Sequence, residues 1–347
     1  MRYATSTKKI PLIYIYATAS ILVVIIALAA YMLMSRAPAN DRPKVFEQIT
    51  IATNTEYVGT CSIIAALENG YFLNEGLQVR IQSHSSGKAA MEAVLQGQAH
   101  LGTVADIPIM FAGLDNRPIL VIATIFKAEK DHGIVGRKDR GVTTPASLKG
   151  KHIGVTQGTS AHFTLDAFLN RQKLNPDDVT KHNYKPEELS KALEKGEVDA
   201  VAGWEPFLGN VLTQLGSNGI AFNGQDVYES LYAVVGVRDY VSKHSETIKK
   251  TLRALALGGR FCNQMPEAAR KLVDGMIKTD TKNLADAWPS YRFDLALDQG
   301  LLLALEDEAR WAIKNKLTNK TATPNYLDYI YLDGLEAVKP STVTIIH

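Results

Sequence analysis

Apolar positions recur along this sequence with two alternating spacings, one typical of strands and one typical of helices. The strand-like runs of the first half are residues 49–53, 77–82, 101–104, 119–126 and 133–136. Between them, residues 62–69 and 88–95 repeat apolar side chains at helical spacing, and each segment ends next to a glycine. This alternation predicts α/β layers built on largely parallel sheets.

The second half repeats the alternation and then changes character. Residues 152–155 and 200–202 have strand patterns, and residues 162–172 and 186–194 have helical ones. Beyond Tyr240 the helical spacing dominates, over residues 245–264, 266–278 and 295–314. The sequence therefore predicts two α/β regions followed by a mainly helical C-terminal part.

A weak internal repeat relates the two α/β regions. Residues 93–100 (AVLQGQAH) align with residues 192–199 (ALEKGEVD), and the same alignment places Asp106 over Glu205. Each copy predicts a helix, a glycine stop, a short apolar strand and then an acid. Ligands of open α/β sheets bind beyond the carboxyl ends of strands, so two facing copies would bring both acids to one crevice. A chance similarity is the alternative.

The N-terminal segment differs from the rest of the chain. Residues 10–34 carry no charge, and Arg2, Lys8 and Lys9 precede them. About 20 apolar residues span a bilayer as a helix, and flanking cations favour the cytoplasmic side. We expect a cytoplasmic segment over residues 1–9, a transmembrane anchor over residues 10–34 and a polar linker over residues 35–47. A cleaved signal segment ending near Ala37-Pro38-Ala39 is the alternative, and both place the body outside the cytoplasm.

Composition and charge exclude several classes of function. The chain has 347 residues with 46% hydrophobic and 21% charged, enough for two compact domains. The net charge is +2, and without Arg2, Lys8, Lys9 and Arg36 it is about −2. No long run of Lys or Arg occurs, so we expect no nucleic-acid partner.

The cysteines and histidines do not have the spacing of catalytic or metal sites. The eight histidines are scattered without a His-x-x-x-His pair, and the sequence holds no Gly-x-Ser-x-Gly elbow. We therefore expect no metal, no cofactor and no enzymatic activity. The two cysteines, Cys61 and Cys262, are interpreted as small buried residues. A disulfide is the alternative, because an oxidising compartment permits one.

Three loops before predicted helices offer groups for a ligand. Gly158-Thr159-Ser160 joins a strand to a helix, and unpaired backbone N–H groups at such a junction suit an anionic head group. Ser85-Ser86-Gly87-Lys88 precedes a helix in the same way, and residues 55–60 open the first helix. Ordinary helix capping without a ligand is the alternative for each loop.

Trp204 and Glu205 place an indole beside a carboxylate at a strand end. The indole could lie against an apolar tail or a ring of the ligand. The carboxylate could accept a hydrogen bond from a ligand ammonium or cap a backbone turn. Asp106 and Glu205 could also form a glycosidase pair, but nothing nearby suggests a sugar-binding surface.

Taken together, these motifs resemble the family of aliphatic sulfonate, taurine and nitrate substrate-binding proteins, close to the binders of thiamine pyrimidine precursors. The resemblance covers residues 48–275 well and the C-terminal helices more loosely. Its motifs are GYFLNEGLQV at residues 70–79, ADIP at 105–108, LKGKHIGVTQGTSAH at 148–162 and VDAVAGWEPF at 198–207.

The resemblance implies a two-lobed periplasmic-binding-protein fold of type II with two crossing hinge segments. Lobe 1 would comprise residues 48–135 and 236–347, and lobe 2 residues 136–235. The ligand would lie between the lobes. The family's pattern places these residues at the pocket: Tyr57, Gly59, Thr60, Ala105, Asp106, Gly158, Thr159, Ser160, His162, Trp204 and Glu205. The helix-start motif adds Ser86 and Gly87 as a second set of donors.

The function that the resemblance implies is the extracytoplasmic solute-binding component of an ABC importer. It would act as a monomer, capture a small anionic or zwitterionic ligand and deliver it to a membrane permease with its ATPase. A ligand-sensing ectodomain with a membrane partner and a binder of a pyrimidine or thiamine precursor are the alternatives. Pyrimidine synthases that resemble these binders carry a cysteine-rich motif, which two distant cysteines cannot supply.

Overall fold

The computed structural model describes residues 25–28, 30–32, 45–224, 227–277, 284–285 and 287–346. The expected cytoplasmic segment lies outside these residues, as do most of the expected anchor and linker. No helix within the described ranges has the length and apolar character needed to cross a bilayer. Residues from Phe46 onwards form one compact unit, to which the description below is confined.

A six-stranded mixed sheet forms the centre of lobe 1, in the order β11-β4-β10-β3-β1-β2. Its strands are β1 (Glu47–Thr53), β2 (Leu77–Ser83), β3 (Leu101–Ala105), β4 (Ile119–Ala128), β10 (Ser230–Val237) and β11 (Tyr291–Arg292). Strand β1 pairs parallel with β2 and β3. Strand β10 runs antiparallel to β3 and β4, and β11 runs antiparallel to β4.

A five-stranded mixed sheet forms the centre of lobe 2, in the order β7-β6-β8-β5-β9. Its strands are β5 (His132–Arg137), β6 (His152–Val155), β7 (Thr180–Asn183), β8 (Ala200–Trp204) and β9 (Gly219–Asn223). Strand β6 is parallel to β7 and β8, and β5 is antiparallel to β8 and β9. The prediction of largely parallel sheets was wrong, because the strands that enter each sheet from the other lobe, β10 and β5, run against their neighbours.

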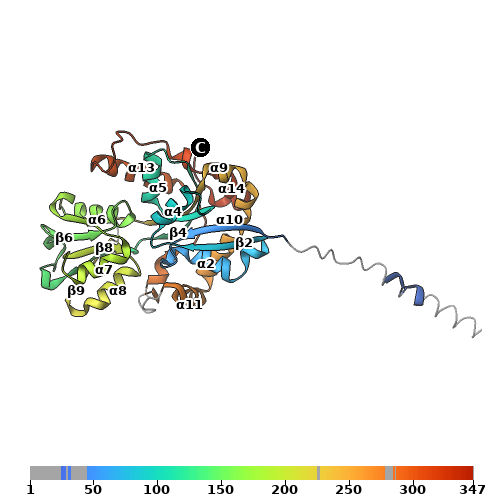
Figure 1. The fold of residues 1–347 in the computed structure, drawn as a ribbon, viewed down its shortest axis with the longest axis horizontal. Helices are drawn as coiled ribbons and strands as arrows, with labels where there is room; N and C mark the ends of the chain where they lie inside the picture. Colours follow the sequence, from blue (N-terminus) through green and yellow to red (C-terminus); the bar gives the residue numbers. More distant parts are fainter. Residues whose placement is uncertain are drawn as a thin grey trace, which may run out of the picture. The chain divides into compact units, whose positions relative to one another are not determined.

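Helices cover both sheets, and the two groups are separate in Figure 1. Lobe 1 carries α2 (Cys61–Glu68), α3 (Tyr71–Asn74), α4 (Gly87–Leu95), α5 (Asp106–Leu114), α9 (Arg238–Lys243), α10 (Ser245–Gln264), α11 (Pro266–Ile277), α13 (Gln299–Lys314) and α14 (Leu332–Val338). Lobe 2 carries α6 (Ser160–Arg171), α7 (Pro186–Glu194) and α8 (Phe207–Leu215), drawn in green and yellow. Short 3-10 helices are η1 (Val58–Thr60), η2 (Lys138–Arg140), η3 (Pro145–Leu148), η4 (Pro176–Asp178), η5 (Gly216–Asn218), η6 (Trp288–Ser290), η7 (Tyr326–Tyr329) and η8 (Pro340–Thr342).

The chain passes between the lobes twice, between β4 and β5 and between β9 and β10. The expected boundaries at 135/136 and 235/236 fall inside β5 and β10, so these two strands belong whole to the sheets that they enter. Lobe 1 has one large apolar core. Lobe 2 has separate apolar clusters, one including Leu165 and the other Leu189. Both faces of its sheet are therefore buried.

Helix α13 starts later than its apolar spacing predicts. Residues 295–298 are not helical, because Ala296 bridges to Thr124 of β4 and Leu297 bridges to Val343. The carboxylate of Asp298 then accepts a hydrogen bond from the backbone N–H of Leu301 at 3.1 Å and caps the helix. The predicted start at residue 295 was wrong, since pairing with the sheet takes precedence over helical spacing there.

Cys61 of α2 and Cys262 of α10 form a disulfide, with a Cα–Cα distance of 6.3 Å. The interpretation as two unpaired buried cysteines was wrong. The two helices approach so closely that a Cβ atom at Gly258 would lie 2.1 Å from the carbonyl oxygen of Ser62. Glycine at this position lets α10 lie against the backbone of α2, which brings the two sulfur atoms within bonding distance.

The internal repeat is confirmed as a repeated local structure. Gly97 follows α4 and Gly196 follows α7, and both have φ of +72°. Each is followed by a short buried strand, β3 or β8, and then by another helix. The two copies lie in different lobes and present their strand ends to the space between the lobes.

Candidate functional site

The central feature between the lobes is a small cavity of about 30 Å³. Lobe 1 and its hinge strand contribute Asn54, Tyr57, Ser86, Gly87, Lys88, Ala105, Pro108 and Tyr232. Lobe 2 contributes His132, Thr159, Ser160 and Trp204. A cavity of about 10–15 Å³ holds one water molecule, so this one has room for about two with the lobes as they stand. The site therefore suits a small head group.

The first turn of α4 forms one wall of the cavity. Ser86 caps this helix, since its hydroxyl oxygen accepts a hydrogen bond from the backbone N–H of Ala89 at 3.2 Å. A Cβ atom at Gly87 would lie 2.8 Å from the Cα of Val104, so only glycine lets the helix start against β3. The backbone N–H groups of Gly87 and Lys88 have no partner within the helix and remain available to a ligand.

The first turn of α6 forms the opposite wall. Gly158 has φ of +70°, and a side chain there would also press on the Lys88 ammonium, 2.9 Å from the Cβ position. The Thr159 hydroxyl donates to the carbonyl of Thr156 at 2.7 Å and holds the turn. Ser160 and the N–H groups of the first turn thus face the cavity from lobe 2.

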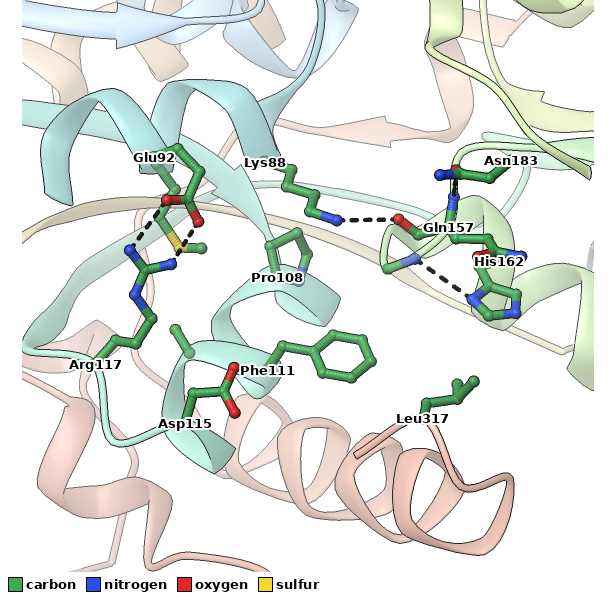
Figure 2. A pocket seen from close by; sticks show the side chains of 13 residues that line it. Lys88, Glu92, Pro108, Phe111, Asp115, Arg117, Gln157, His162, Asn183 and Leu317 are labelled. Atoms are coloured by element: carbon green, nitrogen blue, oxygen red, sulfur yellow. Dashed lines mark hydrogen bonds and ion pairs between the residues drawn. The ribbon is translucent and has the colours of Figure 1, made fainter. Parts of the chain in front are cut away.

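Two helix N-termini therefore face each other across the gap between the lobes. Each carries a partial positive charge, which favours an anion placed between them. Lys88 adds a full positive charge, and its Nζ donates to the carbonyl of Gln157 at 3.1 Å. Figure 2 shows this lysine reaching from α4 towards lobe 2. The arrangement is chemically suited to hold an anion.

Tyr57 reaches the cavity from the loop after β1, and two predicted site residues hold it there. A Cβ atom at Gly59 would lie 2.4 Å from the Tyr57 ring, so glycine makes room for the ring. The Thr60 hydroxyl donates to the carbonyl of Tyr57 at 2.6 Å. Neither Gly59 nor Thr60 lines the cavity, and both act on the site through Tyr57.

Behind Tyr57 lies a buried chain of polar groups. The Tyr57 phenol donates to Asp131 Oδ2 at 2.7 Å, and the same Oδ2 lies 3.4 Å from His132 Nδ1. His132 Nε2 lies 2.7 Å from the Ser160 hydroxyl oxygen. Burial lowers the pKa of His132 to about 3, so the imidazole is neutral. Burial, helped by the charge of Glu205, raises the pKa of Asp131 to about 7.

Asp106 and Glu205, the two acids of the repeat, are bonded to protein groups. The Tyr228 phenol and the backbone N–H of Ile107 donate to Asp106 Oδ1, at 2.5 and 2.8 Å. Glu205 accepts a hydrogen bond from the backbone N–H of Gly209 at 3.0 Å and caps α8. Burial raises the pKa of both carboxyl groups, to about 6 for Asp106. Neither carboxylate is among the residues that line the cavities of the cleft.

The central cavity adjoins a larger one on each side. The wider one, of about 400 Å³, shares Lys88 and Pro108 with the centre and includes Gly158 and His162. Burial lowers the pKa of His162 to about 4, so it adds no positive charge. Around this mouth Figure 2 shows Arg117 bonded to Glu92. The lysine is therefore the cation that lines both the centre and the wider cavity.

The second adjoining cavity, of about 130 Å³, shares Asn54 and Trp204 with the centre. Its apolar lining comes mainly from the starts of α7 and α8, through Pro186, Leu189, Trp204, Pro206 and Phe207. Trp204 thus stands between a polar centre and a hollow with an apolar side, whose lining also includes Glu56 and Glu187. Such a hollow suits the non-polar part of a ligand.

The structure brings most of the predicted site residues together. Those that line the central cavity are Tyr57, Ser86, Gly87, Ala105, Thr159, Ser160 and Trp204. The residues that sequence reasoning missed are Asn54, Lys88, Pro108, His132 and Tyr232. Lys88 carried a signal, since it follows Gly87 in the helix-start motif. His132 and Tyr232 carried none, because hinge strands bring them in from distant parts of the sequence.

Within the ranges that the structure describes, no group of three or more His, Cys, Asp or Glu side chains is arranged to hold a metal ion. The residues that line the central cavity offer N–H, O–H and ammonium donors around a neutral imidazole.

Comparison with known proteins gives consistent results. The profile of the NMT1/THI5-like family matches residues 32–269. A protein described as a binding protein in Brucella abortus is 23% identical over 261 residues, 74% of this chain and 79% of the relative. The taurine-binding periplasmic protein of Escherichia coli is 26% identical over 192 residues, 54% and 58% of the two chains. The alkanesulfonate-binding protein SsuA of Xanthomonas axonopodis, solved with MOPS, has a TM-score of 0.71 at 19% identity over 82% of this chain and 98% of that one.

Proposed function

Because the chain belongs to the NMT1/THI5-like family, we propose that it is the extracytoplasmic solute-binding component of an ABC importer. The family match confirms the family resemblance that the sequence motifs indicate. The fold is that of SsuA. The proposed ligand is a small anion or zwitterion of the sulfonate, taurine or nitrate class. It is captured between the lobes without chemical change.

One observation carries this proposal: the N-termini of α4 and α6, on different lobes, line one cavity. Helix N-termini attract anions through unpaired N–H groups and the helix dipole. A ligand held between two such termini has contacts with both lobes only when the lobes are together. Binding therefore favours the closed form, which a permease can distinguish from the open one.

The lining of the cleft also supports a choice among ligands. The donors around the centre and the Lys88 ammonium suit an anionic head, and Asp106 and Glu205 are bonded to protein groups. The apolar hollow beside Trp204, of about 130 Å³, is near the 150 Å³ of an engineered protein cavity that binds benzene. A short alkyl chain or a ring attached to the head group would fit there. Each buried methylene should add about 0.8 kcal/mol to binding.

Two features support an extracytoplasmic location for residues 48–347. Residues 10–34 are uncharged and follow three cations, as in a membrane anchor or a signal segment. The Cys61–Cys262 disulfide is typical of an oxidising compartment. We place the body outside the cytoplasm, where it works as a monomer with a membrane permease and its ATPase.

A thermal-shift panel tests the proposed function. The purified body is heated with methanesulfonate, butanesulfonate, taurine, nitrate or an aminopyrimidine, each at the same ionic strength. A ligand at 100 times its dissociation constant stabilises the folded form by about 2.7 kcal/mol. We expect stabilisation by at least one sulfonate and more by butanesulfonate than by methanesulfonate. Stabilisation by the aminopyrimidine alone, or by none of the panel, would contradict the proposal.

A further inference from the structure

The buried groups Asp131, His132 and Ser160 form a line that ends at the ligand cavity. His132 Nε2 lies 2.7 Å from Ser160 Oγ, and His132 Nδ1 lies 3.4 Å from Asp131 Oδ2. All three residues are at least nine-tenths buried. Asp131 Oδ1 and His132 Nδ1 have no hydrogen-bond partner in the part of the chain that the structure describes. The position of one proton along this line is therefore free to vary.

A neutral imidazole carries its proton on one of its two nitrogens. With the proton on Nε2, His132 donates to Ser160, and the serine O–H is free to donate into the cavity. With the proton on Nδ1, His132 faces Asp131, and Ser160 must donate to Nε2. The serine then presents only lone pairs to the cavity, which repel an anion.

We propose that Asp131 and His132 are positioning residues that set the direction of the Ser160 hydroxyl and so couple anion capture to the protonation of Asp131. This inference rests on the proposed function, because it concerns the same anion site. A protonated Asp131 can donate to Nδ1 and keeps the imidazole proton on Nε2. An ionised Asp131 attracts the imidazole proton to Nδ1. The Ser160 hydroxyl then donates to Nε2 and offers only lone pairs to the ligand.

The surroundings of Asp131 support a change of its charge near neutral pH. The titratable and polar side chains that act on it from the packed elements are Tyr57, His132, Glu205, Ser230 and Tyr291. Burial and the charge of Glu205 raise the pKa of Asp131, while hydrogen bonds from Tyr57 and Ser230 lower it, and the result is about 7. His132 stays neutral above about pH 3. Asp131 is thus the member of the line that titrates near pH 7.

The test is the affinity of the folded protein for methanesulfonate, measured by calorimetry between pH 5.5 and 8.5. This probe is a strong acid and keeps its charge throughout. We expect the affinity of the wild type to fall about tenfold as pH rises through 7, the worth of one hydrogen bond to a charged group. By linkage, binding at pH 7 should also take up protons from the buffer.

Three variants separate this mechanism from other titrations. Asp131→Asn should bind with constant affinity, because its carboxamide can donate to Nδ1 and, as in serine-protease triads, selects one tautomer. Ser160→Ala should bind about tenfold more weakly at pH 5.5 and show no pH dependence. Ser160→Thr restores a hydroxyl, so the pH dependence that Ser160→Ala loses should return. Circular dichroism at each pH checks that every variant is folded. If Asp131→Asn does not fold, the comparison of Ser160→Ala with the wild type still tests whether the pH dependence of affinity acts through the serine.

Two results would overturn the inference. One is constant wild-type affinity between pH 5.5 and 8.5, which leaves the proposed function standing. The other is a pH dependence that persists in Ser160→Ala, which assigns the titration to another group. If methanesulfonate, butanesulfonate, taurine and nitrate all fail to bind at any pH, the proposed function fails together with this inference.

Discussion

The indole Nε1 of Trp311 donates a hydrogen bond to Asp166 Oδ2 at 3.1 Å, although the two residues lie on different lobes. Trp311 belongs to α13 of lobe 1, and Asp166 belongs to α6, whose first turn faces the ligand cavity. Lys181 also binds Asp166, at 2.6 Å, from β7 of lobe 2. The bond therefore ties α13 to the helix that presents Ser160, and it can form only when the lobes are together.

Trp311→Phe should weaken the closed form without disturbing its aromatic packing. Phenylalanine keeps the ring contacts with Phe163 and His162 but lacks the N–H, and a hydrogen bond to a charged group contributes about 1.5–3 kcal/mol. We expect small-angle X-ray scattering to show a larger radius of gyration for the ligand-free variant. Methanesulfonate affinity should fall about tenfold, because less of the protein is in the binding-competent form.

Trp288→Phe is the matched control, since it removes an indole bond to the carbonyl of Cys262 within lobe 1. It should lower the free energy of unfolding but leave the radius of gyration unchanged. Equal scattering changes in both variants would show that Trp311 has no special role between the lobes.

Lys88→Gln should lower the affinity for methanesulfonate by about tenfold, because it removes the cation that lines the centre of the cleft. The remaining affinity should depend less on salt, since a screened charge pair is gone. The control is the double variant Arg117→Gln/Glu92→Gln, which removes a pair that bonds at 2.6 and 3.0 Å and has no net charge. A loss of affinity in the control as large as in Lys88→Gln would contradict a specific role for the lysine. Calorimetric titration at two salt concentrations makes the comparison.

Removal of the disulfide should destabilise the body. Cys61 and Cys262 are separated by 201 residues, and a bond that closes a long loop contributes typically about 2–4 kcal/mol by restricting the unfolded chain. We expect urea denaturation to show a free energy of unfolding lower by that amount in the double variant Cys61→Ala/Cys262→Ala. Reductant should lower the stability of the wild type and leave the variant unchanged. Two free thiols in the folded, non-reduced wild type would disprove the pairing.

A buried carboxyl pair predicts how stability depends on pH. Glu308 of α13 faces Asp106, and burial raises the pKa of Asp106 to about 6 and that of Glu308 well above its ordinary range. Between pH 4 and these values the folded protein holds protons that the unfolded chain has released. The stabilising contribution is therefore full below about pH 4 and is lost as pH rises, by up to about 1.4 kcal/mol per unit for each proton.

Glu308→Gln should flatten this dependence, because its carboxamide can donate to Asp106 without a proton to lose. Urea denaturation at pH 5 and 8 should show the variant more stable than wild type at pH 8. Glu306→Gln, whose carboxylate is partly exposed on the same helix, should keep the wild-type slope. If the free energy of unfolding of Glu308→Gln depended on pH as steeply as that of the wild type, the pair of Glu308 and Asp106 would not be the source of the dependence.

Much of the fold could be predicted from apolar spacing. Residues 186–194 and 245–264 are helical over the predicted range, because each segment places its apolar side chains on one buried face. Strand direction could not be predicted, since the same alternation of strand and helix is compatible with a hinge strand that runs backwards. The disulfide and the start of α13 depend on contacts between segments far apart in the sequence.

The candidate site could be predicted only in part, for a related reason. Gly158 and Ser160 belong to a local motif, a strand followed by a glycine turn and a helix, which the sequence shows directly. His132 and Tyr232 reach the cavity because two strands cross between the lobes, and no local pattern marks them. Glu205 was left with two roles by the sequence, a ligand contact or a cap, and the hydrogen bond from the Gly209 N–H favours the cap on the helix that follows it.

The most direct test of the account is a crystal structure of the protein grown with saturating methanesulfonate. We expect the sulfonate between the first turns of α4 and α6, within hydrogen-bond distance of the Ser160 hydroxyl and of backbone N–H groups from both lobes. A closed cleft without the sulfonate, or a sulfonate bound only outside it, would contradict the claim that opposed helix N-termini capture the ligand.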